Sequence, residues 1–261
     1  MNDAPPAVLS ERRGRVLVVT INRPDQRNAV NAAVAHGIAA ALDELDADAG
    51  LSAGVLTGAG KGFCAGMDLK AFGASGSGGP TPSDPRASAM QQALFAGEFP
   101  KPVVAAVNGA AVGGGLELVL GSDLVVAADH ARFGLPEVKR GLYPAGNGTM
   151  IATRIPLALA LEMGLTGDLV TAERAAAIGL VNRIVAGGEL IAAALDLAGR
   201  VAANGPLGVA LTKKLMRASV QQGPQHGRAT TEETSAVFGS ADAKEGAAAF
   251  MEKRPPRFVG R

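Results

Sequence analysis

Four short apolar runs, with helix-forming sequence between them, constrain the fold of this chain most strongly. They occupy residues 16–21, 53–57, 103–107 and 124–128. Runs of five or six mostly apolar residues are typical of buried strands, whereas helices need longer patterns. Because helical stretches separate these runs, the sequence predicts an α/β fold with repeated β-β-α turns.

Local signals place the elements around these strands. The turn at 12–14 (Arg-Arg-Gly) predicts a hairpin that pairs Ala7–Leu9 with 16–21. Asn31 is typical of a helix N-cap, and we expect its helix to reach about Leu45. Residues 73–85 have the composition of a mobile loop. Beyond residue 145 we expect a helix capped by Thr171, a strand at 183–185, a helix from Pro206, and helices at Gln225–Phe238 and Asp242–Lys253.

Charge and composition argue against several classes of protein. The formal net charge of +1 gives no electrostatic basis for binding nucleic acid, and aromatic residues make up only 3% of the 261 residues. The single cysteine, Cys64, cannot form an internal disulfide. With only three histidines beside it, a Cys/His zinc cluster is disfavoured, so we expect no bound metal.

The sequence predicts neither a signal peptide nor a membrane span. Residues 1–6 contain an acid and two prolines but no apolar h-region. The most apolar stretch, 103–128, is interrupted by Asn108, Glu117 and Asp123, whereas a transmembrane helix needs about 20 predominantly apolar residues. We therefore expect a soluble, cytoplasmic protein that does not bind membranes.

Two glutamates that follow glycine-rich turns are the main candidates for a catalytic site. Glu117 ends the run 108–117, which contains three successive glycines, and Glu137 ends the run 133–137 (Phe-Gly-Leu-Pro-Glu). A third segment, 63–70, lies upstream of both. Glycines allow backbone amides to approach a ligand closely, and paired carboxylates can move protons. These segments suggest a site that stabilises an oxyanion while two acids handle water and a proton.

Each of these features also has a simpler structural explanation. The glycines could serve only a tight β-α turn that requires small residues. Glu117 could be an exposed partner of the helix dipole, or a buried carboxylate among leucines that needs polar partners. Glu137 could be an ordinary surface acid. The ordered combination of Ala-Gly-x-Asp, Gly-Gly-Gly-x-Glu and Phe-Gly-x-Pro-Glu is far more specific than any single member.

Other familiar motifs fail in this chain. Counted from Gly113, the third glycine of a dinucleotide fingerprint falls on Leu118, and the turn at 58–62 lacks the Ser or Thr of a phosphate loop. No G-x-S-x-G sequence occurs, so a serine hydrolase is disfavoured. We interpret Cys64, next to Phe63, as a small residue that faces the core.

These segments resemble the enoyl-CoA hydratase/isomerase (crotonase) superfamily, and the resemblance covers nearly the whole chain. It begins at 21–29 (Ile-Asn-Arg-Pro-Asp-Gln-Arg-Asn-Ala) and continues through 63–70, 108–117 and 133–137. Further matching segments lie at 173–181 and 245–254. The resemblance implies a crotonase-like spiral of β-β-α units over residues 1–200 and a helical C-terminal trimerisation region over 201–261.

The resemblance also implies partners and binding residues. It implies homotrimers, often paired as hexamers, with CoA carried by the substrate, so that no separate cofactor is expected. The implied oxyanion-hole donors are the backbone N–H groups of Met67 and Gly114. The implied CoA and substrate contacts are Arg27, Ala65, Asp68, Leu69 and Lys70, together with Phe250 and Lys253, which match positions that reach a neighbouring subunit's CoA in related enzymes.

The activity implied by the resemblance is reversible hydration of a trans-2-enoyl-CoA to a 3-hydroxyacyl-CoA. Hydratases of the family resemble this chain in having both glutamates. By that resemblance, Glu117 deprotonates water for attack at Cβ, and Glu137 delivers a proton to Cα. The alternatives are an enoyl-CoA isomerase, a specialised acyl-CoA dehydratase, and a non-catalytic CoA- or RNA-binding relative. The chain departs from the family at Asn147, in a glycine run, and at Met67, which is bulkier than the usual alanine.

Overall fold

The computed structural model describes residues 5–68 and 84–261 of the chain. All of the strands expected from the apolar runs are present, and they begin within one residue of the expected positions. In chain order, the strands are β1 (Val8–Arg13), β2 (Val16–Ile21), β3 (Ala53–Gly58), β4 (Val103–Val107), β5 (Ala110–Val112), β6 (Leu124–Ala128), β7 (Arg132–Gly134), β8 (Val170–Thr171) and β9 (Arg183–Val185).

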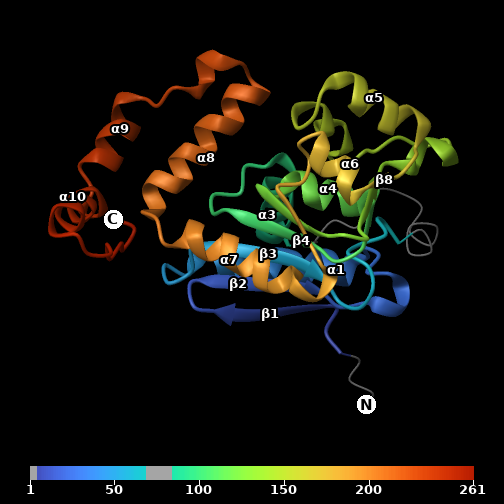
Figure 1. Cartoon of the computed structure of the whole chain (residues 1–261), viewed down its shortest axis with the longest axis horizontal. Coiled ribbons are helices and arrows are strands. Elements are labelled where there is room, and N and C mark those ends of the chain that lie inside the picture. The colour runs from blue at the N-terminus through green and yellow to red at the C-terminus, as the bar shows by residue number, and fades with distance from the viewer. Residues whose placement is uncertain (1–4, 69–83) are drawn as a thin grey trace.

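The strands form two sheets, and Figure 1 labels β1, β2, β3 and β4 of the larger one. The larger sheet has six strands in the order β1-β2-β3-β4-β6-β9, and all of its pairs except β1–β2 are parallel. The smaller sheet has three strands in the order β5-β7-β8. Since β5 and β7 each follow a strand of the large sheet directly, the chain repeats a β-β-α pattern.

Helices cover both faces of the large sheet. The α-helices are α1 (Ala32–Ala47), α3 (Pro85–Ala96), α4 (Gly114–Gly121), α5 (Leu157–Thr166), α6 (Ala172–Ala177), α7 (Leu190–Ala202), α8 (Pro206–Gln221), α9 (Thr231–Phe238) and α10 (Ala241–Glu252). The 3-10 helices are η1 (Pro24–Gln26), η2 (Pro136–Arg140), η3 (Gly148–Thr153), η4 (Gly187–Glu189) and η5 (Pro224–Gly227).

The alternation of side chains along each strand divides the core into two parts. Val16 and Val18 of β2 lie on one face with Val104 and Ala106 of β4, and residues four apart on α7 pack against them. Leu17 and the other odd-numbered residues of these strands face the opposite side, where α1 and α4 contribute buried leucines. Burial on both faces explains why these strands are continuous apolar runs.

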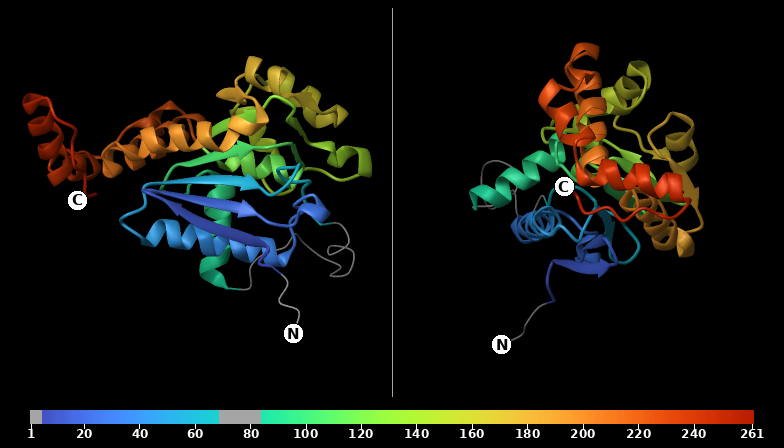
Figure 2. Two further views of the ribbon diagram at one scale, coloured as in Figure 1. Left: turned by 60° about the horizontal axis from the view of Figure 1, so that its bottom comes forward. Right: turned by 90° about the vertical axis from the view of Figure 1, so that its left-hand side faces the viewer.

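The C-terminal helices project from the body of the protein. Figure 2 shows α8, α9 and α10 extending as an arm away from the sheets, with the C-terminus at its far end. The boundary between α7 and α8 falls at 203–205, close to the expected division at residue 200. A division of the chain into two domains stays a prediction, because the arm and the core share contacts at α8.

Some local expectations differ from the structure in detail. The first strand runs to Arg13, so the hairpin turn falls at Gly14 and Arg15 and shares only Gly14 with the expected turn. The helix expected at Gln225–Phe238 is divided, because Thr230 and Glu233 form a capping box that begins α9. Asn31 and Thr171 cap α1 and α6 as expected. Most of the loop expected at 73–85 lies outside the described residues.

Within the described residues, no helix has both the length and the apolar character that a membrane span requires.

Candidate active site

The glycine-rich segment between β5 and α4 places Glu117 inside the protein. Gly113 has φ +57 and precedes α4, whose first turn contains Glu117. The Glu117 side chain projects into the interior, and only 6% of the residue is exposed. Of the two explanations left open by the sequence, burial is therefore the one that the structure supports, and the carboxylate needs polar partners.

Backbone N–H groups supply those partners. Gly146, Asn147 and Gly148 all donate to Glu117 Oε1, at 3.0, 2.9 and 2.9 Å. Because N–H groups can only donate, Oε1 is occupied as an acceptor, and a proton taken up by Glu117 would go to Oε2. Oε2 accepts no hydrogen bond among the described residues, so it is available to a ligand.

Glu137 lies beside the same glycine turn. It belongs to η2, directly after β7, and is half-buried. A Cβ added to Gly113 would lie 3.0 Å from Glu137 Oε1, which places the carboxyl next to the start of α4. Its Oε2 is buried without a hydrogen-bond partner among the described residues. Burial, and secondarily the charge of Glu117, raises the pKa of Glu137 and so favours its protonated form.

Two backbone N–H groups, those of Met67 and Gly114, lie near the carboxylates. Cys64 forms a parallel bridge with Ala111 of β5, and Met67, three residues later, lies beside Gly114. A Cβ added to Gly114 would lie 3.6 Å from the nitrogen of Met67. The close approach requires Gly66, because it has φ +92 and a Cβ there would lie 2.8 Å from the carbonyl oxygen of Val112.

Neither of these N–H groups donates a hydrogen bond within the described residues. A Cβ added to Gly114 would also lie 3.7 Å from Glu117 Oε2, so an acceptor oxygen shared by the two N–H groups would lie close to the carboxylates. This combination of two unpaired N–H groups and two carboxylates can stabilise an oxyanion and transfer protons next to it.

The residues expected to contact CoA separate into three groups. Arg27, Ala65 and Asp68 lie together beside Met67, because Ala65 donates from its N–H to the carbonyl of Arg27 and Asp68 donates to the carbonyl of Val30. The Asp68 carboxylate also pairs with Arg23, at 3.1 Å, which gives it a role in holding this segment. Leu69 and Lys70 lie outside the described residues.

The two C-terminal candidates do not join this site within the chain. Phe250 is 82% exposed on α10, and Lys253 follows the helix in a left-handed conformation. Figures 1 and 2 show α10 at the far end of the arm, away from α4. A role for Phe250 and Lys253 at a CoA site therefore requires a second copy of the chain.

Cys64 lies beside this site, but its thiol is not available for chemistry. Cys64 is fully buried, and desolvation raises the pKa of its thiol to about 12, so it is not an available nucleophile. The described residues contain no group of three or more His, Cys, Asp or Glu side chains that could hold a metal ion.

Sequence reasoning missed the N–H groups of 146–148 that hold Glu117. A backbone donor leaves no residue-type signal, although the glycines at 146 and 148 mark the segment. It also missed the buried ion pairs of Asp123 with Lys213 and Arg217, at 2.7 and 2.9 Å. Asp123 was visible as a charge inside an apolar stretch, but its partners are 90 and 94 residues away in sequence.

Comparison with known proteins gives consistent matches along the chain. The family model described as enoyl-CoA hydratase/isomerase matches residues 11–261. The crystal structure of enoyl-CoA hydratase EchA1 from Mycobacterium marinum is 48% identical, with a TM-score of 0.87, and covers 98% of this chain and 100% of that one.

Two curated relatives carry different activity names. Enoyl-CoA hydratase EchA19 of Mycobacterium tuberculosis is 39% identical over 259 residues, which cover 98% of this chain and 97% of that protein. Carnitinyl-CoA dehydratase of Salmonella arizonae is 40% identical over 256 residues, which cover 95% of this chain and 97% of that protein.

Proposed function

This chain belongs to the enoyl-CoA hydratase/isomerase family, and we propose that it catalyses the reversible hydration of trans-2-enoyl-CoA thioesters to 3-hydroxyacyl-CoA. The resemblance and the crotonase-like α/β fold predicted from the sequence are confirmed by the family match and the structural neighbours. The observation that carries the activity is the pair of carboxylates, Glu117 and Glu137, at one glycine turn with two unpaired N–H groups.

The N–H groups of Met67 and Gly114 bind the thioester oxygen in this proposal. Addition of water to Cβ of an enoyl thioester moves an electron pair through Cα to the carbonyl oxygen, which becomes an enolate. Two preorganised donors stabilise that charge, and loss of one such donor typically costs roughly 3–4 kcal/mol. The partial positive charge at the start of α4 acts in the same direction.

The two glutamates move the protons. Glu117 takes a proton from water onto Oε2, and the hydroxide oxygen forms its bond to Cβ. Glu137, which the raised pKa keeps protonated to a higher pH, gives its proton to Cα as the enolate collapses. One proton is taken and one is given, so the pair returns to its starting state after exchange with water, and the reverse sequence dehydrates the product.

These steps need only water and the acyl-CoA, so we expect no separate cofactor. The activity acts on a thioester whose CoA is part of the substrate. The acyl group has to reach Glu137, and Tyr143, in the loop that precedes the N–H groups of 146–148, is 71% exposed there. We expect this loop to influence which acyl groups are accepted.

We also propose that the chain assembles as a homotrimer or a dimer of trimers. The arm exposes large apolar side chains, with Phe238, Phe250 and Met251 exposed by 78%, 82% and 79%. A groove of about 900 Å³ lies between α8 and the core, partly lined by Met216, Val220 and Val237. Apolar surface of this kind favours association with another copy.

A second candidate is dehydration of a more specialised 3-hydroxyacyl-CoA. The 40% identical carnitinyl-CoA dehydratase favours it, because that relative covers 95% of the chain, against 98% for the hydratase EchA19. The same carboxylates and donors would serve both directions, so the two candidates differ in the acyl group and not in the chemistry. By contrast, no observation specifically favours an isomerase or a non-catalytic relative.

The decisive experiment follows the absorbance of the conjugated enoyl thioester. Short, medium and bulky trans-2-enoyl-CoAs are supplied separately, and the product is identified by mass spectrometry. Rapid loss of absorbance with a mass gain of one water would support hydration, and the fastest substrate would define the acyl preference. A protein that binds acyl-CoA but hydrates none of them would contradict the proposal.

A further inference from the structure

Asp123 joins the two ends of the segment that carries Gly114 and Glu117, which runs from β4 to the end of α4. Asp123 follows α4, and its N–H donates to the carbonyl of Val103, at the start of β4, at 2.8 Å. The N–H of Val103 donates in return to Asp123 Oδ2, at 2.9 Å. The two ends of the β4-β5-α4 unit are therefore joined, with the candidate site at its other end.

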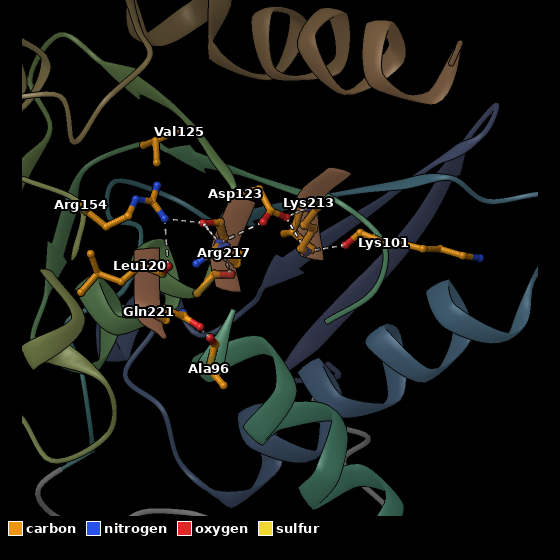
Figure 3. Close-up of polar contacts among 12 residues, drawn as sticks. Ala96, Lys101, Leu120, Asp123, Val125, Arg154, Lys213, Arg217 and Gln221 are labelled. Carbon is orange, nitrogen blue, oxygen red and sulfur yellow. Dashed lines mark hydrogen bonds and ion pairs between the residues drawn. The ribbon is translucent and has the colours of Figure 1, made fainter. Parts of the chain in front are cut away.

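Two side chains of helix α8, in the arm, contact Asp123 directly, as Figure 3 shows. Lys213 Nζ contacts Asp123 Oδ2 at 2.7 Å and donates to the carbonyl of Lys101 at 3.2 Å. Arg217 contacts Asp123 Oδ1 at 2.9 Å and donates to the carbonyl of Ser122 at 3.0 Å. Both side chains are largely buried, with 10% and 18% exposed.

Arg154 adds a third cation at the same end of α4. Its guanidinium donates to the carbonyls of Leu120 and Ser122, at 3.1 and 2.9 Å. The segment that ends at Arg154 begins with the N–H groups of 146–148 that hold Glu117. Helix α4 is thus fixed at its first turn by that segment and at its last turn by Arg154 and Arg217.

Together, Asp123, Arg154, Lys213 and Arg217 hold the C-terminal end of α4, and we call these four residues the clamp. The last carbonyls of a helix have no intrahelical partners and carry partial negative charge, so buried guanidinium groups there satisfy and stabilise them. A helix of eight residues is about 12 Å long and rigid, so a shift at its C-terminal end displaces its N-terminal end as well. Gly114 and Glu117 lie at that N-terminal end.

We propose that Arg217 is a positioning residue, which acts through α4 to set the geometry of the Gly114 N–H and the Glu117 carboxylate. The inference rests on the proposed hydration. Because α8 belongs to the arm, the proposal also makes the catalytic geometry depend on the C-terminal region. Arg217 does not touch the substrate, and its effect is on the alignment of the groups that do.

The test compares Arg217→Met with Lys214→Met on the same helix. Lys214 faces outward and pairs with Glu233 of α9, so its loss removes an exposed ion pair without reaching α4. We expect Arg217→Met to lower kcat about 10- to 100-fold, the range expected when catalytic groups are displaced by a fraction of an ångström to 1 Å. We expect KM to change much less, and Lys214→Met to match wild type.

A spectroscopic measurement separates positioning from a purely structural role. An aryl-acryloyl-CoA absorbs at longer wavelength when hydrogen bonds to its thioester oxygen polarise the conjugated system. The bound probe should show a smaller red shift in Arg217→Met than in wild type or Lys214→Met, at saturating probe and with unchanged oligomeric state. An undiminished red shift together with wild-type kcat would overturn the proposal.

Two further measurements keep the proposal open to refutation. If Arg217→Met does not fold, Arg217→Lys replaces it. The lysine keeps a cation for Asp123 but loses the planar guanidinium that reaches the carbonyls of Gly121 and Ser122. We expect this variant to lose kcat several-fold. Wild-type kcat and red shift in that variant would refute it. If wild type itself hydrates no enoyl-CoA, the proposed function fails, whereas hydrogen exchange of the α4 amides still tests the clamp: it should be faster in the Arg217 variant than in Lys214→Met.

Discussion

A Cβ added to Gly146 would lie 2.2 Å from Oε2 of Glu117, so these two residues can be neighbours only while position 146 has no side chain. The same glycine donates its N–H to Oε1 of the carboxylate at 3.0 Å. One residue therefore both admits the Glu117 side chain and fixes it.

The substitution Gly146→Ala should displace the Glu117 carboxylate and lower kcat by about 100-fold, because misplacement of a catalytic group by about 1 Å has an effect of that size. Steady-state hydration kinetics would measure the loss. The matched control is Gly164→Ala, since a Cβ there meets nothing within 4 Å and the glycine lies inside α5. Equal kinetics for the two alanine variants would contradict this account of Gly146.

Glu137→Gln should abolish turnover while acyl-CoA binding persists. The amide keeps the size of the side chain but cannot deliver a proton, and general acid-base catalysis typically contributes about 100- to 10,000-fold. Hydration is followed by absorbance, and binding by calorimetry with a saturated acyl-CoA. Hydration at the wild-type rate in this variant would eliminate Glu137 as the proton donor.

Because the pKa of Glu137 is raised, its contribution to the free energy of unfolding should decrease as the pH rises. A carboxyl whose folded-state pKa lies above the unfolded value contributes stability at pH values below the unfolded pKa, and that contribution is lost as the pH rises through the folded pKa. Glutamine at 137 has no such titration. The free energy of unfolding of wild type minus that of Glu137→Gln should therefore fall as the pH rises from about 4 toward neutrality.

Urea denaturation at several pH values measures this difference. Glu232→Gln is a control of opposite sign, because the hydrogen bonds of the α9 N-terminus lower the pKa of Glu232. The stability that Glu232 contributes is present at higher pH and is lost as the pH falls through its folded pKa. If the stability difference between wild type and variant changed with pH in the same direction for both variants, burial of Glu137 would not be the cause of its pH dependence.

The strands and helix caps could be predicted from the sequence because their causes are local. Val16–Ile21 is apolar wherever it lies, and Asn31 accepts from the N–H of Val34 three residues later. The proximity of Glu117 and Glu137 was only suggested by their glycine turns. It depends on the pairing of β5 with β7, which joins segments about twenty residues apart.

The clamp on α4 lay beyond sequence reasoning for a different reason. Lys213 and Arg217 have the spacing of an ordinary solvated helix face, and only the fold shows that this face is buried against Asp123. Likewise, the donors to Glu117 are backbone groups, whose positions depend on the whole loop. A contact with a distant or backbone partner has no pattern in one sequence.

The final prediction concerns Phe250 and Lys253, which lie at the far end of the arm, away from α4. If the chain forms trimers, they serve the site of a neighbour, and Lys253→Ala should raise KM for acyl-CoA with little change in kcat. Lys253→Ala subunits, which have intact glutamates, should recover a lower KM when co-assembled with Glu137→Gln subunits, which have an intact arm. Each glutamate site in the mixture can then border a wild-type lysine.

The control for this complementation is Lys253→Ala co-assembled with the double variant Glu137→Gln/Lys253→Ala, which supplies no wild-type lysine and should leave KM high. Sedimentation equilibrium establishes whether wild type is a trimer or a hexamer at the assay concentration. A monomer would refute the assembly, and a trimer whose mixed forms keep the high KM would place Lys253 outside the neighbour's CoA site. Because the two lesions lie in different subunits, recovery of a low KM requires the site to be shared.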